Sequence, residues 1–189
     1  MRYSLLLLLW CCGAAFVPLA AQWSWLPETS VGYAWGGIRA LGGQPLRATG
    51  LVGRVGSVVR YRRGAWAIQG GAGAKWLLPR GRFGETPYRG RALRLVLPVG
   101  LDYRWRGGRW LGLGYEWQTA RHLADFRASP ARAVRHNLWG RYRFTFRHRW
   151  LGGLLLHGAL DSLPATFYVA DPRWSVSLSF TYQINAPDE

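Results

Sequence analysis

The segment Trp174–Tyr182, WSVSLSFTY, alternates between apolar and polar side chains without interruption. Its odd positions are serine or threonine, and its even positions are Trp174, Val176, Leu178, Phe180 and Tyr182. Because successive side chains of a strand point to opposite faces, this pattern predicts a β-strand with one apolar face. That face would turn inward in a soluble sandwich or carrier barrel, and outward in a barrel that spans a membrane.

The first 21 residues have the features of a secretory signal peptide. Arg2 is followed by an apolar run from Leu5 to about Val17, and the small residues Ala20 and Ala21 come next. The run is too short for a membrane helix. We expect cleavage after Ala21, which leaves residues 22–189 as a single domain with a short C-terminal tail at residues 185–189.

Both cysteines, Cys11 and Cys12, lie inside this segment. Lipoprotein processing there is an alternative to cleavage after Ala21, although the preceding Leu-Leu-Trp suits it poorly. Residues 22–189 contain no cysteine, so they predict neither disulfides nor a thiolate metal site, and we expect no metal and no cofactor. An exported β-protein without cysteine is typical of a bacterial envelope.

The chain is strongly basic, with 25 Lys and Arg residues against 9 Asp and Glu residues and a formal net charge of +16. Lys75 is the only lysine. Arginine suits bidentate contacts with phosphate and carboxylate groups. The export signal makes nucleic acid an improbable partner despite this charge.

Seven further segments have the composition of strands, and together with the opening segment, extended to Ile184, they make eight. They are Thr29–Ala40, Leu51–Arg62, Ala65–Leu77, Ala92–Arg106, Arg109–Thr119, His136–Arg147 and Trp150–Leu160. The connections between the eight alternate between long and short, so short turns gather at one end and long loops (41–50, 78–91, 120–135 and 161–173) at the other. This arrangement predicts an all-β fold, an eight-stranded antiparallel up-and-down transmembrane β-barrel.

Three features favour a membrane barrel over a soluble carrier with an apolar pocket. The polar faces contain glycine, serine and arginine with hardly any acid, whereas a soluble exterior usually mixes both signs of charge. Several strands are long enough to span the apolar layer when tilted. Aromatic residues lie near the strand ends on the apolar faces, as lipid-facing girdles require, and the girdle residues are Trp66, Trp76, Trp105, Trp117, Trp174 and Tyr182.

The polar faces would then line the inside of the barrel. An eight-stranded barrel has room for its own side chains and little more. We expect a network of paired, hydrated charges there, and its members are Arg54, Arg60, Lys75, Arg94, Asp102, Arg104, Glu116, Arg141 and Arg143. The excess of positive charge leaves a narrow anion-conducting path as an alternative.

The long loops are also basic, with Arg80, Arg82, Arg89 and Arg91 in the second and Arg121, Arg127, Arg132 and Arg135 in the third. These arginines suit the phosphates of lipopolysaccharide at the outer surface. Ordinary solvated loop charge is the other reading.

By this architecture, residues 22–189 resemble the small eight-stranded outer-membrane barrels of the OmpA-transmembrane and OmpX-like group. The resemblance rests on strand number and pattern and on no local motif. It implies a bacterial outer-membrane location, contact with outer-membrane lipids, and a structural, anchoring or accessory-subunit role without catalysis. A partner protein in an outer-membrane complex fits that role.

Two rival functions follow from the same fold. Some eight-stranded barrels modify lipid A with a histidine, a serine and an acid, and the nearest such set here is His157, Asp161 and Ser162. The motifs of those enzymes, including His-x-Ser-Asn, are not matched. The second rival is a narrow channel for a small or anionic solute.

Overall fold

The computed structural model describes residues 22–39, 45–83, 86–89, 91–121, 134–160 and 173–184. These residues are nearly all in strands. The elements are β1 (Gln22–Arg39), β2 (Pro45–Arg63), β3 (Trp66–Phe83), β4 (Thr86–Arg89), β5 (Ala92–Trp105), the 3-10 turn η1 (Arg106–Gly108), β6 (Arg109–Arg121), β7 (Val134–Arg147), β8 (Trp150–Ala159) and β9 (Trp174–Tyr182). No helix among them is both long enough and apolar enough to cross a membrane.

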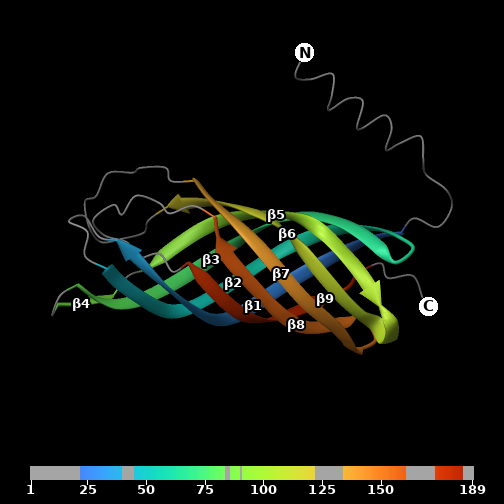
Figure 1. Cartoon of the computed structure of the whole chain (residues 1–189). Helices are drawn as coiled ribbons and strands as arrows, with labels where there is room; N and C mark the ends of the chain where they lie inside the picture. Colours follow the sequence, from blue (N-terminus) through green and yellow to red (C-terminus); the bar gives the residue numbers. More distant parts are fainter. Residues whose placement is uncertain are drawn as a thin grey trace, which may run out of the picture.

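Eight of the nine strands form one closed antiparallel barrel (Figure 1). Each of these eight strands pairs with the barrel strands before and after it, so that β3 pairs with β5, and β1 pairs with β9 to close the ring. The short strand β4 lies outside the ring and pairs with the end of β3. The predicted all-β, eight-stranded up-and-down barrel is therefore confirmed.

The barrel has one end with tight turns. There β2 joins β3 through Gly64 and Ala65, β7 joins β8 through His148 and Arg149, and η1 joins β5 to β6. Gly107 and Gly108 have φ angles of 70° and 71°, a left-handed conformation that favours glycine. We call this the turn end and the opposite end the loop end.

The first two predicted long loops are shorter than the sequence suggested. Residues 45–50 belong to β2, and β3 continues to Phe83, where it forms a hairpin with β4. Glycine and proline in these segments indicated loops, but pairing with neighbouring strands holds the backbone extended. The predicted signal peptide, the C-terminal tail and residues 122–133 and 161–172 lie outside the described residues.

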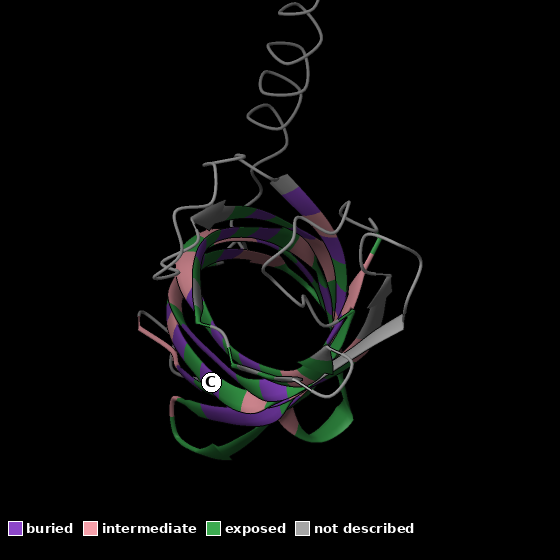
Figure 2. Cartoon of the chain, turned by 90° about the vertical axis from the view of Figure 1, so that its left-hand side faces the viewer, coloured by how far each residue is buried: buried purple, intermediate pink, exposed green. Residues whose placement is uncertain are grey.

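Burial alternates along the strands, which gives the barrel a distinct inside and outside (Figure 2). In β9 the inward residues Ser175, Ser177, Ser179 and Thr181 are buried, whereas Leu178 and Phe180 between them are about half exposed, at 55% and 46%. The sequence of β8 left its facing open. The structure turns Leu151, Leu155 and His157 inward and leaves Leu154 and Leu156 exposed.

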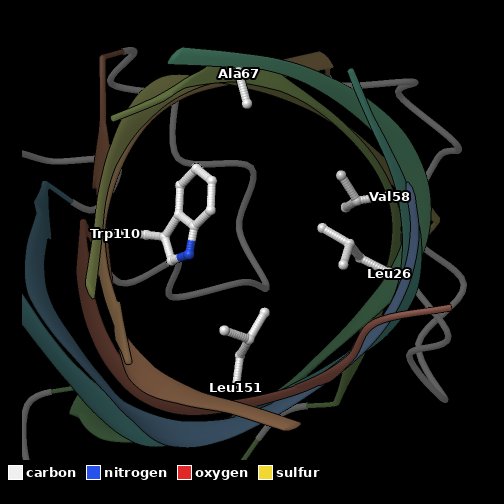
Figure 3. Close-up of a cluster of buried hydrophobic side chains, with 5 residues drawn as sticks. All are labelled: Leu26, Val58, Ala67, Trp110 and Leu151. Atoms are coloured by element: carbon white, nitrogen blue, oxygen red, sulfur yellow. The ribbon is translucent and has the colours of Figure 1, made fainter. Parts of the chain in front are cut away.

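The inside also contains apolar side chains that the predicted polar network did not include. Near the turn end, five buried side chains point toward the barrel axis (Figure 3), and they are Leu26, Val58, Ala67, Trp110 and Leu151. Near the loop end a smaller cluster contains Ala34, Val52 and Leu77.

A second tryptophan, Trp139, is also buried inside, where its ring lies over two glycines. A Cβ at Gly100 would lie 2.3 Å from this ring, and one at Gly114 would lie 2.4 Å from it. Glycine at these two positions leaves the space that the indole fills. Small residues on β5 and β6 thus match a large residue on β7.

Candidate functional site

The candidate site is the charged interior of the barrel. Of the nine residues predicted to form a lumen network, eight are buried inside, and Arg104 at the turn end is partly exposed. The structure adds Glu28, Gln69, Gln118, Arg135 and Asn137 to the buried polar set. Arg135 had been predicted in a long loop, and this was wrong, because it is an inward residue of β7.

Asp102 lies at the centre of one group of contacts. The Arg141 Nη2 and the Asp102 Oδ2 are 3.3 Å apart, and Arg143 forms an ion pair with the same carboxylate oxygen. Gln69 donates a hydrogen bond to the Asp102 Oδ1 over 3.2 Å and accepts one from Arg141. One fully buried carboxylate therefore contacts two guanidinium groups, and its single negative charge balances one of their two positive charges.

Glu28 extends this group across the barrel from β1. Its Oε2 lies 3.0 Å from the Arg141 Nη1, so Arg141 links the carboxylates of two strands that are not neighbours. The sequence reasoning missed Glu28 because the first strand was predicted to begin only at Thr29. The scarcity of acid in the chain was the signal that could have identified it.

Glu116 is the centre of a second group, nearer the loop end. Its Oε2 lies 2.7 Å from the Arg54 Nη1, and its Oε1 accepts a hydrogen bond of 2.7 Å from Gln118. Gln118 in turn accepts a hydrogen bond of 2.9 Å from Arg94. The His157 Nε2 lies 3.5 Å from the Glu116 Oε1.

Positive charge exceeds negative charge inside the described barrel. The buried carboxylates are Glu28, Asp102 and Glu116, and the buried basic residues are Arg54, Arg60, Lys75, Arg94, Arg135, Arg141 and Arg143. All three carboxylates of the described residues lie inside, so none of them is on the outer surface. Each of these three carboxylates contacts at least one arginine inside the lumen.

The turn end of the lumen contains an apolar layer and an arginine stacked on a tryptophan. The Arg60 guanidinium carbon lies 4.4 Å from the centroid of the Trp110 ring, and that of Arg104 lies 5.9 Å from it. These distances are within the range of cation–π attraction. Near the loop end a cavity of about 10 Å³ remains between Asn137, His157 and Leu77, which is room for about one water molecule.

The candidate residues of the rival enzyme hypothesis lie only partly within the described structure. His157 is buried in the lumen, opposite Ser175 of β9 and beside Glu116. Asp161 and Ser162 lie outside the described residues. No cluster of three or more His, Cys, Asp or Glu side chains suited to a metal ion occurs in the part of the chain that the structure describes.

The outside of the barrel is an apolar band between two rings of aromatic residues. Five of the predicted girdle residues are exposed, and Tyr182 is partly exposed; the five are Trp66, Trp76, Trp105, Trp117 and Trp174. Aromatic side chains of neighbouring strands are in contact at the turn end, where the tilted rings of Trp66 and Tyr103 have centroids 4.8 Å apart. The sequence reasoning missed further ring members at Trp23, Trp35 and Trp150.

The band between these rings carries no charged side chain on the described strands. Its outward positions are apolar, aromatic or glycine, apart from Thr29, Thr49, Ser57, Thr119 and His136. The exposed arginines lie at the two ends, for example Arg63 and Arg109 at the turn end and Arg80 at the loop end. Such a surface is unusual for a protein in water, where charged residues of both signs are interspersed over the exterior and large continuous apolar patches are rare.

No protein-family model matches this chain, and the comparison with curated proteins found no similar sequence. Function is therefore inferred from the fold and from the distribution of charge.

We predict that Asp102→Asn lowers the free energy of unfolding by about 3–5 kcal/mol, because the change leaves Arg141 and Arg143 without their shared carboxylate. Urea unfolding of the barrel in detergent measures this. Arg109→Gln, at an exposed position, should change stability by less than about 0.5 kcal/mol. If Asp102→Asn lowers the free energy of unfolding no more than Arg109→Gln does, the ion pairs of Asp102 do not stabilise the barrel.

Proposed function

We propose that the chain is a bacterial outer-membrane β-barrel protein with a structural, anchoring or accessory-subunit role and no catalytic chemistry. The observation that carries this proposal is a distribution of residues opposite to that of a soluble protein. Charged side chains are buried inside the barrel, and apolar side chains are exposed on its outer surface. The signal-like N-terminal sequence agrees with export to the outer membrane.

The height of the band supports a membrane location. The outward tryptophans Trp66 and Trp76 of β3 are ten residues apart. At about 3.3 Å per residue the strand rises about 33 Å between them, and a tilt of about 40° reduces this to about 25 Å along the barrel axis. That is the height of the apolar band in outer-membrane barrels.

The filled interior supports a structural role over transport. A soluble carrier needs an apolar pocket, but the lumen contains ion pairs and a layer of packed side chains at the turn end. A solute would have to displace Trp110 and the stacked Arg60 and then cross the paired arginines. Both steps oppose a continuous conducting path.

The same contacts argue against catalysis at His157. A general base needs a nucleophile within hydrogen-bond reach and access for the substrate. His157 is buried, and its nearest acid, Glu116, is already occupied by Arg54 and Gln118. A lipid substrate would approach from the outside of the barrel, whereas this histidine faces the inside.

We predict that the protein is recovered with the outer membrane in a Gram-negative host and is released only by detergent. An unheated sample should migrate differently from a boiled sample on a denaturing gel, because the closed barrel resists detergent until it is heated. Recovery in the periplasmic fraction without detergent, together with the absence of a gel shift, would contradict the proposal.

We also predict that the purified barrel shows no stepwise conductance in a planar bilayer, because its lumen is filled. A general porin in the same bilayer serves as the positive control. Reproducible conductance steps from this barrel, lost on heating, would favour the narrow-channel alternative instead.

A further inference from the structure

The hairpin formed by β3 and β4 projects beyond the closed barrel at the loop end (Figure 1). The hairpin and the residues directly after β4 carry four arginines, and all four are exposed: Arg80, Arg82, Arg89 and Arg91. Glu85 of the same segment lies outside the described residues, and with it the sequence 79–91 still has a net charge of +3. We call the four side chains the hairpin arginines.

Two of the hairpin arginines are direct cross-strand partners. Arg80 of β3 pairs in register with Arg89 of β4, which brings their Cβ atoms to about 5 Å from one another. Arg82 pairs with Pro87, so it lies diagonally across from Arg89 on the same face, at about 7–8 Å. Like charges at these positions destabilise a strand pair unless an anion lies between them.

The carboxylates of the described residues do not supply this anion. Glu28, Asp102 and Glu116 are all buried inside the barrel and occupied by other arginines. Two guanidinium groups that face the same space can hold a phosphate by paired, charge-assisted hydrogen bonds. The hairpin therefore presents a phosphate-binding arrangement to the exterior.

The place of the hairpin along the barrel identifies the source of the phosphate. Trp76, Leu78 and Arg80 are successive outward residues of β3, and Trp76 belongs to the aromatic ring of the loop end. Arg80 lies four residues beyond it, about 13 Å along the strand. If the ring lies at the membrane boundary, as the proposed function has it, the hairpin arginines reach the layer of lipid phosphates.

We propose that the hairpin arginines bind the phosphate groups of an outer-leaflet glycolipid, with Arg80 and Arg89 as the central pair. This inference rests on the proposed outer-membrane location. The lipid surface supplies several phosphates at once, which matches a row of arginines better than a single free phosphate ion does.

The test is the binding of lipid A to the refolded barrel in detergent, counted by native mass spectrometry. Bis-phosphorylated lipid A should bind, and the double variant Arg80→Gln/Arg89→Gln should bind it about tenfold more weakly. Dephosphorylated lipid A should bind the two forms equally. Added salt should weaken the wild-type interaction, because the arginines are exposed.

The matched control is Arg63→Gln/Arg106→Gln, which removes the same charge from exposed positions at the turn end. This variant should bind phosphorylated lipid A as the wild type does. If both double variants lose the same affinity for phosphorylated lipid A, the loss comes from the lower net charge and not from the hairpin. That result would overturn the proposal. If inorganic phosphate displaces lipid A at a concentration similar to that of lipid A, the site binds free phosphate as well as it binds the lipid. That result would contradict a glycolipid as the ligand.

The two proposals fail in different ways. A barrel that shows no gel shift and does not enter detergent micelles contradicts the outer-membrane location. A barrel that refolds with a gel shift but binds phosphorylated and dephosphorylated lipid A equally contradicts the phosphate site alone.

Discussion

Three carboxylates, Glu28, Asp102 and Glu116, hold the arginines that fill the barrel. Each lies at 0–4% exposure and contacts at least one guanidinium group. A buried pair of this kind adds little net stability compared with packed apolar residues, but the loss of one partner is costly. The contacts join strands that are not neighbours in the sheet, such as β1 and β7. They therefore connect opposite sides of the barrel across its lumen.

This charged interior also fixes the register of the strands. Because side chains alternate with a period of two, a slip of one residue would turn the lumen arginines outward and the leucines inward. In the proposed membrane location, each arginine turned outward at the bilayer midplane would cost about 2–4 kcal/mol. The same alternation therefore specifies both the closed lumen and the uncharged exterior, and it leaves charge on the outer surface only at the two ends.

The alternation of apolar and polar residues made the fold and most inward residues predictable, because it can be read within each strand without knowing which strands lie beside it. The contacts among those residues were less predictable. That Arg141 reaches Glu28 depends on which strands face each other across the closed ring. Trp139 occupies an inward position where Gly100 and Gly114 leave space for its ring, and Trp110 lies inside in an apolar cluster. Tryptophan otherwise indicated the outer rings. The hairpin at 80–89 depends on strand pairing, which outweighed its glycine and proline content.

The most direct test of the inverted polarity uses nitroxide labels on β9. Residues 22–189 contain no cysteine, so single cysteines at positions 175 to 181 can be labelled without background. Power-saturation electron paramagnetic resonance of the barrel in lipid vesicles then compares accessibility to oxygen, which concentrates in lipid, with accessibility to a polar nickel complex. We predict high oxygen accessibility at positions 176, 178 and 180 and low oxygen accessibility at positions 175, 177 and 179. The reverse alternation, or preference for the nickel complex at all positions, would contradict this prediction.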